Sequence, residues 1–129
     1  MNSTLSIYLD NCGNNKRAVN MNKNAKAELD RIVSTLAGTG IISKIILFGS
    51  YARGEETPES DIDLCVLTPV KNRREIDMMT DFRIMLCDIQ KRPMDLFAYN
   101  KDVFLFHAER PTSFEHLIAD EGVTLYEHT

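Results

Sequence analysis

Two segments of the chain repeat their hydrophobic residues every three or four positions. Because an α-helix turns once every 3.6 residues, this spacing predicts two amphipathic helices. The apolar positions of the first are Ala25, Leu29, Ile32, Val33 and Leu36, and glycines follow at 38 and 40. Those of the second are Ile76, Met79, Phe82, Leu86 and Ile89. Two shorter helices are predicted at residues 102–109 and 111–122.

Four short runs rich in β-branched and aromatic residues are typical of β-strands. They cover residues 41–48, 61–67, 94–99 and 123–127. The loop between the first two is too short for a helical crossover, so we expect these strands to be antiparallel or joined by a functional loop. The order of elements predicts an α/β fold with a small mixed sheet, in one domain over residues 23–129. The asparagine-rich residues 1–22 are predicted to be a flexible leader.

Composition excludes some classes of protein. The apolar fraction of 43% is ordinary for a folded domain, and the net charge is −4 without a long basic block. A nucleic-acid surface built on positive charge is therefore not expected. The three cysteines, at 12, 65 and 87, form no CxxC pair, which favours a reducing compartment. No apolar run approaches the ~18 residues of a membrane span, and we expect a cytoplasmic protein.

Two acidic residues, Asp61 and Asp63, stand at the head of the second predicted strand. Residues i and i+2 of a strand share a face, which places their Cα atoms ~6.5–7 Å apart. Adjacent carboxylates repel each other unless a cation lies between them. Oxygen ligands at this spacing suit Mg²⁺, which takes one or two carboxylates together with waters and substrate phosphates. An isolated D-x-D is more often the solvated polar end of a strand, so further features must decide.

Three further features favour a site. Gly49-Ser50 directly follows the first strand, where glycine admits a ligand close to the backbone and the Ser50 hydroxyl can bind phosphate oxygens. Asp95 heads the third strand and would join the acidic pair if strands two and three are neighbours. Arg53 could contact a phosphate, or equally one of the glutamates at 55, 56 and 59.

Gly49-Ser50, ten residues and then Asp61-Ile62-Asp63 resemble the GSx₁₀DxD signature of the nucleotidyltransferase superfamily, which includes DNA polymerase β and kanamycin nucleotidyltransferase. The string from 44 to 67 is most similar to the minimal MNT domains, and the similarity continues through Asp95 and "FEHLIADEGVTLYE". The resemblance implies a polymerase β palm-like fold.

The same resemblance implies two-metal nucleotidyl transfer from ATP. Asp61, Asp63 and Asp95 would hold two Mg²⁺ ions, and Asp95 would complete the second metal site or accept the proton of the acceptor. Gly49 and Ser50 would bind the triphosphate, with Arg53 as a further candidate for nucleotide binding.

MNT domains resemble the antitoxins of HEPN–MNT toxin–antitoxin pairs, which implies transfer of AMP to a tyrosine of a HEPN ribonuclease toxin. Larger relatives carry a helical domain for the acceptor, and 129 residues leave no room for one, so we expect the acceptor on a partner or across a homodimer. Two alternatives stay open: an antitoxin that acts by binding alone, and a small-molecule nucleotidyltransferase of the aminoglycoside-modifying type.

Other reactive or apolar residues are expected to be structural. His107 and His116 are assigned surface or capping roles, and Cys65 and Cys87 are expected to pack as small apolar groups. The stripe Met78, Met79, Phe82 and Met85 is expected in the core.

Overall fold

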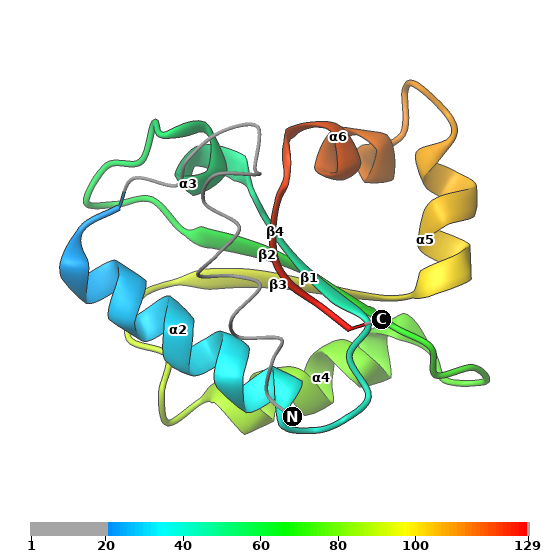
Figure 1. Cartoon of the computed structure of the whole chain (residues 1–129), viewed down its shortest axis with the longest axis horizontal. Coiled ribbons are helices and arrows are strands. Elements are labelled where there is room, and N and C mark those ends of the chain that lie inside the picture. Colours follow the sequence, from blue (N-terminus) through cyan, green and yellow to red (C-terminus); the bar gives the residue numbers. More distant parts are fainter. Residues whose placement is uncertain (1–20, 129) are drawn as a thin grey trace.

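A four-stranded sheet with helices on both faces makes up the computed structural model, which describes residues 21–128 (Figure 1). The strands are β1 (Lys44–Phe48), β2 (Ile62–Thr68), β3 (Met94–Asn100) and β4 (Val123–Glu127). The helices are α2 (Lys23–Ala37), α3 (Gly49–Arg53), α4 (Glu75–Leu86), α5 (Lys101–Ala108) and α6 (Phe114–Glu121). Helices α2 and α4 cover one face, and α5 and α6 cover the other (Figure 1). This is the α/β fold with a small mixed sheet that the sequence predicts.

The strand order in the sheet is β3-β2-β1-β4. Strand β1 pairs antiparallel with both β2 and β4, which confirms the antiparallel arrangement expected for the first two strands. Strands β2 and β3 are parallel and are connected through α4, because a parallel pair needs a crossover. Their register places Asp63 opposite Asp95. The parallel pair therefore brings the heads of both strands to the same edge of the sheet.

Strand β2 is apolar on both faces because helices cover both. Ile62, Leu64 and Val66 belong to the core cluster beneath α2 and α4. Cys65 and Leu67 alternate with them and belong to a second cluster with residues of α5 and α6. By the same alternation, Asp63 lies on the face of the sheet that α5 and α6 cover.

Helix α2 begins at Lys23, and the side chain of Asn22 caps it by accepting a hydrogen bond of 2.8 Å from the Ala25 amide. An asparagine at this position satisfies one of the amides that a helix leaves unpaired at its start. Residues 1–20 of the expected leader, with Cys12, lie outside the described residues. Among the helices that the structure describes, none is both long and apolar enough to cross a bilayer.

Helix α4 differs from its prediction in extent and in its buried face. It ends at Leu86, and its buried stripe is Met78, Phe82 and Leu86, at i, i+4 and i+8. Met85 and Cys87 lie off this stripe and are exposed, so the expectation that they pack in the core is wrong. Cys65 is fully buried, as expected.

Candidate active site

Three acidic side chains gather where β2 and β3 begin. Asp61 is exposed and directly precedes β2, and Asp63 is half-buried one residue inside that strand. Asp95 is exposed at the second position of β3, opposite Asp63 in the parallel register. The structure therefore brings together the three acids that the sequence singles out, although Asp95 is 32 positions from Asp63 along the chain.

The charged form of one of these carboxylates, Asp63, is destabilised by its surroundings. Burial of the Asp63 carboxyl, the charges of Asp95 and Asp61, and a hydrogen bond with Asp95 raise the pKa of Asp63 from 3.8 to about 6. Arg53 opposes this shift. A group of hard oxygen donors held together against mutual repulsion is suited to a divalent cation, because the cation removes the repulsion.

Magnesium fits this set of donors better than a metal that requires a closed protein cage. Within residues 21–128, no three His, Cys, Asp or Glu side chains are arranged as a ready-made cluster around one ion. Mg²⁺ takes only one or two carboxylates and keeps waters and substrate phosphates as its other ligands. Asp61, Asp63 and Asp95 could hold Mg²⁺ in that manner, with ligands completed by a substrate.

The turn that follows β1 requires glycine for two reasons. Gly49 has φ +76°, which lies in the left-handed region that side chains disfavour. A Cβ at Gly49 would also collide with the carboxylate of Asp63. The backbone of the Gly49-Ser50 turn therefore lies directly against the acidic group, and any larger residue at position 49 would separate them.

Glu121, at the end of α6, binds this turn from the far end of the sequence. Its Oε2 accepts a hydrogen bond of 2.8 Å from the Gly49 amide. Its two carboxylate oxygens lie 3.1 and 3.3 Å from Nη1 of Arg53. Nε of Arg53 donates to Glu55 over 2.9 Å, so of the three loop glutamates considered for Arg53 the structure selects Glu55. The sequence analysis missed Glu121, because no spacing signal links positions 72 residues apart.

A second ionic contact anchors the segment that leads into β3. The Glu28 carboxylate is 2% exposed and accepts hydrogen bonds from the amides of Lys91 and Arg92 at 2.6 and 3.1 Å, and from Nε of Arg92 at 2.9 Å. Nη1 of Arg92 lies 3.4 Å from the Tyr51 hydroxyl in α3. This contact was also missed, although Glu28 stands out as an acid on the apolar face of α2.

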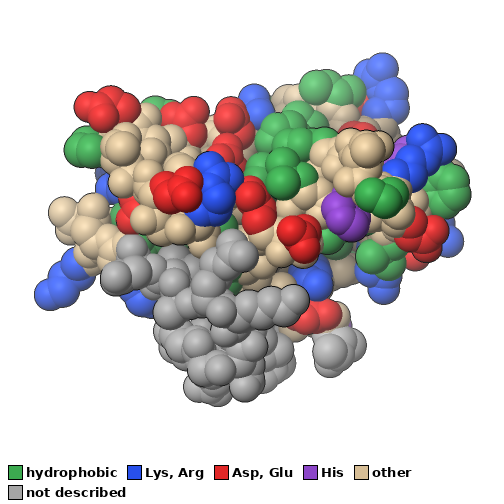
Figure 2. All heavy atoms as spheres, turned by 90° about the horizontal axis from the view of Figure 1, so that it is seen from above, with side chains coloured by type: hydrophobic (Ala, Val, Ile, Leu, Met, Phe, Trp, Pro, Cys, Tyr) green, Lys and Arg blue, Asp and Glu red, His purple; other side chains and the backbone are tan. Residues whose placement is uncertain are grey.

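An aromatic group lies on the same face of the sheet as the acids. Phe48, Phe97 and Phe114 contact one another with ring centroids 5.3 to 6.0 Å apart. Phe97 follows Asp95 by two positions in β3, and Phe114 opens α6 with 43% of its surface exposed. Seen from above the view of Figure 1, on the side where α3, α5 and α6 lie, acidic and hydrophobic side chains lie next to one another (Figure 2).

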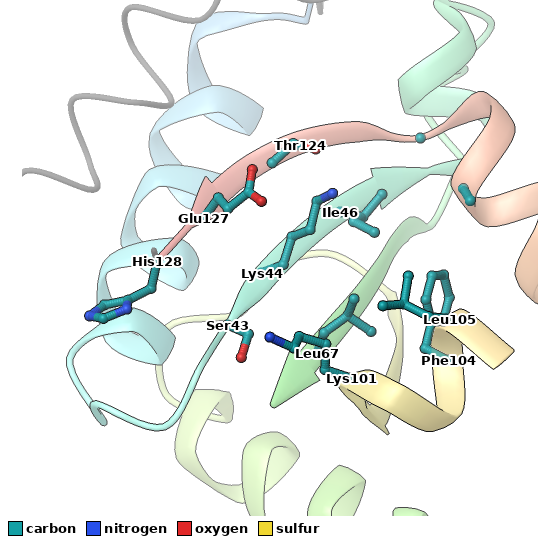
Figure 3. A pocket seen from close by; sticks show the side chains of 12 residues that line it. Ser43, Lys44, Ile46, Leu67, Lys101, Phe104, Leu105, Thr124, Glu127 and His128 are labelled. Carbon is teal, nitrogen blue, oxygen red and sulfur yellow. The ribbon is translucent and has the colours of Figure 1, made fainter. Parts of the chain in front are cut away.

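A cavity of about 360 Å³ lies elsewhere, between α5 and the sheet (Figure 3). Lys44 and Glu127 line it from β1 and β4, and Lys101 and Phe104 line it from α5. Lys44 starts β1, whereas Gly49 follows the other end of that strand. The cavity therefore does not include the acidic group.

The chain matches the family model described as polymerase β, nucleotidyltransferase, over residues 30–129. It is 39% identical over 87 residues to a provisionally named protein adenylyltransferase of Methanocaldococcus jannaschii, covering 67% of this chain and 81% of that protein.

Solved structures show the same fold at low sequence identity. A mutant of the toxin–antitoxin complex MntA-HpeT aligns with a TM-score of 0.55 and 18% identity, over 84% of this chain and 76% of the other. A provisionally assigned nucleotidyltransferase from Sulfolobus solfataricus aligns with a TM-score of 0.51 and 18% identity, over 86% and 94%. The chain thus belongs to the polymerase β nucleotidyltransferase family, and it is a nucleotidyltransferase.

Proposed function

We propose that this nucleotidyltransferase is a magnesium-dependent protein adenylyltransferase that transfers AMP from ATP to a tyrosine of a cognate HEPN-type toxin and so neutralises it. The observation that carries the reaction class is the group of Asp61, Asp63 and Asp95 against the Gly49 backbone. Two names support the acceptor class: the Methanocaldococcus relative is named a protein adenylyltransferase, and one structure of similar fold is a toxin–antitoxin complex.

In the proposed site, Asp61 and Asp63 hold Mg²⁺, and Asp95 completes the metal site or accepts the proton of the acceptor. Bound there, Mg²⁺ neutralises triphosphate charge and lowers the pKa of the acceptor hydroxyl. The Gly49 and Ser50 turn binds the triphosphate beside Asp63, and Arg53 supplies a positive charge. These groups hold and orient the reactants, which is the main contribution a protein makes to this class of reaction.

The proposed transfer forms one bond and breaks one bond. The tyrosine oxygen attacks the α-phosphorus of ATP, and the new O–P bond replaces the bond between the α-phosphorus and the bridging oxygen. That oxygen leaves with pyrophosphate. The hydroxyl proton passes to Asp95 or to water, so charge and atoms balance without any further reactant.

Exposed apolar side chains on α5 and α6, the helices that cover the same face of the sheet as the acids, support a protein acceptor. We define the α5–α6 patch as five side chains with 41 to 62% of their surface exposed: Val103, Leu105, Phe106, Phe114 and Leu117. One member, Phe114, contacts Phe48 and Phe97, which lie on the same face as the acids. Exposed apolar surface of this kind is typical of protein interaction sites.

The proposal is tested by removing both acids of the D-x-D pair. With ATP, Mg²⁺ and the co-expressed toxin, the wild-type protein should add AMP to a toxin tyrosine, detected by mass spectrometry of the toxin. The double variant Asp61→Ala, Asp63→Ala should lose ~10³-fold or more of the rate, because the metal can no longer be held. Its circular dichroism should match that of the wild-type protein.

The matched control is Asp77→Ala with Asp81→Ala, which removes two exposed acids of α4 on the other face of the sheet. This control should transfer AMP at the wild-type rate. Transfer that persists in the Asp61, Asp63 variant contradicts the metal assignment. Full neutralisation of an unmodified toxin would favour an antitoxin that acts by binding alone.

A further inference from the structure

We propose that Glu121 is a positioning residue for nucleotide binding: it orients Arg53, and with it the Gly49 turn, toward the triphosphate. This inference rests on the proposed function and adds to it a residue that lies outside the GSx₁₀DxD motif. Glu121 contacts the Gly49 amide and the Arg53 guanidinium, and the proposed effect passes through these two groups.

Two carboxylates restrain the guanidinium of Arg53. Glu55 accepts from Nε at 2.9 Å, and Glu121 accepts from Nη1 at 3.1 and 3.3 Å. The remaining nitrogen, Nη2, makes no hydrogen bond within the described part of the chain. A guanidinium carries its donors in a rigid plane, so fixing two nitrogens also fixes the direction of the third. Arg53 thereby offers one oriented, unused donor group.

The two carboxylates that contact Arg53 differ in solvent exposure and in their other contacts. The side chain of Glu121 is 12% exposed, whereas that of Glu55 is 65% exposed. Glu121 also accepts a hydrogen bond from the Gly49 amide, which holds its carboxylate in place independently of Arg53. Glu121 is therefore the better-anchored of the two supports, and Glu55 is a more exposed second support.

The same carboxylate joins Arg53 to the acidic group. Gly49 lies so close to Asp63 that a Cβ there would collide with its carboxylate. By holding the Gly49 amide and Arg53 together, Glu121 sets the position of the positively charged Arg53 guanidinium relative to Asp63. A triphosphate bound through metal at Asp63 would meet an arginine whose conformational entropy is already reduced, and preorganisation of this kind improves affinity.

The same contacts are compatible with an opposite role for Glu121. Its negative charge could instead compete with the triphosphate for Arg53, since exposed ion pairs and phosphate contacts use the same donors. Positioning predicts that neutralising Glu121 weakens triphosphate binding, and competition predicts that it strengthens binding. Whether triphosphate binding weakens or strengthens in a variant with a neutral residue at position 121 therefore distinguishes positioning from competition.

The experiment measures steady-state AMP transfer and the binding of inorganic triphosphate with Mg²⁺ to Glu121→Gln. The amide oxygen of glutamine can still accept from Gly49, so the change mainly weakens the hold on Arg53. We expect the KM for ATP and the Kd for triphosphate to rise about fivefold to tenfold, with kcat changed less than about twofold.

A double-mutant cycle shows whether the effect passes through Arg53. In an Arg53→Gln background, Glu121→Gln should change the Kd for triphosphate by less than about twofold, because the group it positions is gone. Glu55→Gln alone should raise that Kd by about twofold, and this exposed site gives a second variant that does not threaten folding. The charge control is Asp120→Asn, which removes the neighbouring exposed acid of α6 and should leave KM unchanged.

Three results would overturn the inference: a lower Kd in Glu121→Gln, an unchanged Kd with a lower melting temperature, or an effect that persists in the Arg53→Gln background. If the wild-type protein neither binds triphosphate nor transfers AMP, the proposed function fails and the inference fails with it. That outcome is distinguishable because the wild-type protein itself is then inactive.

Discussion

Among the residues of the site, Asp63 has the least favourable environment for a negative charge. It lies half-buried between Asp61, Asp95 and the Gly49 backbone, and burial together with the two neighbouring charges raises its pKa to about 6. An ionised carboxylate in this place lowers the stability of the metal-free protein. For this reason, substituting a functional residue often increases the stability of the folded protein.

Asp63→Asn should therefore stabilise the protein in EDTA by about 1 kcal/mol at pH 7, a value that allows for solvent screening of a half-exposed group. The native pKa of about 6 lies above the ordinary 3.8, so the native state holds the proton more tightly and wild-type stability falls as pH rises between these values. The increase in the free energy of unfolding caused by Asp63→Asn should grow over the same pH interval and then stay constant.

Urea denaturation at pH 4, 5, 6 and 7 measures this gain, with Asp88→Asn as a control that changes an exposed acid outside the group. Saturating Mg²⁺ should reduce the gain, because an ion bound to the native acids stabilises the wild-type protein. A gain that is the same at pH 4 and pH 7 would contradict the electrostatic explanation.

At the scale of elements, the start of β3 depends on α2. Glu28, almost fully buried in α2, binds two backbone amides and the side chain of Arg92. These contacts hold the chain just before Met94, where β3 begins, and so help to place Asp95 at the second position of that strand. A buried carboxylate with several donors tolerates neither loss of its charge nor loss of its partner.

Glu28→Ala should lower the free energy of unfolding by about 3 kcal/mol, because three donors lose their acceptor. Glu28→Gln should cost less, since one amide oxygen remains as an acceptor. Chemical denaturation measures both changes. Arg31→Ala, at an exposed position of the same helix, should change stability by less than about 0.5 kcal/mol. Equal effects of the alanine variants at 28 and 31 would show that the Glu28 contacts contribute little.

For the whole molecule, the mixed sheet separates two surfaces. The acidic group, the Gly49 turn and the α5–α6 patch belong to the side that α5 and α6 cover, and α2 and α4 cover the other side (Figure 1). Within the α5–α6 patch, Phe114 contacts Phe48 and Phe97, which lie on the same face of the sheet as the acids. Under the proposed function, substrate chemistry and partner recognition would share one side of the protein.

Phe106→Ser with Leu117→Ser should raise the KM for the protein acceptor about tenfold or more, because both side chains are exposed members of the α5–α6 patch. Kinetics with purified toxin measure this change, and the Kd for inorganic triphosphate should stay the same. Ile84→Ser makes the same kind of change at a 66% exposed position of α4, on the other face, and should have no effect. Equal losses in both variants would contradict the assignment of the patch.

Local sequence was sufficient for much of the fold and for the motif. Helical spacing from Ala25 to Leu36 placed α2, and the β-branched runs placed all four strands to within a few residues. Gly49, Ser50, Asp61 and Asp63 were identified because a turn and a strand head follow one another within 15 residues. Such features depend on periodicity and backbone conformation, which neighbouring residues decide.

The tertiary structure alone decided which distant groups meet. The parallel register of β2 and β3 placed Asp95 opposite Asp63, and α6 carried Glu121 to Gly49 across 72 positions. Burial of Glu28 and exposure of Cys87 followed from how α2 and α4 pack on the sheet. Local sequence does not indicate which distant residue a side chain will contact, because such contacts form only when the chain folds. The sequence by itself therefore determined the chemistry that is available, and the packing of the sheet and helices determined which groups support it.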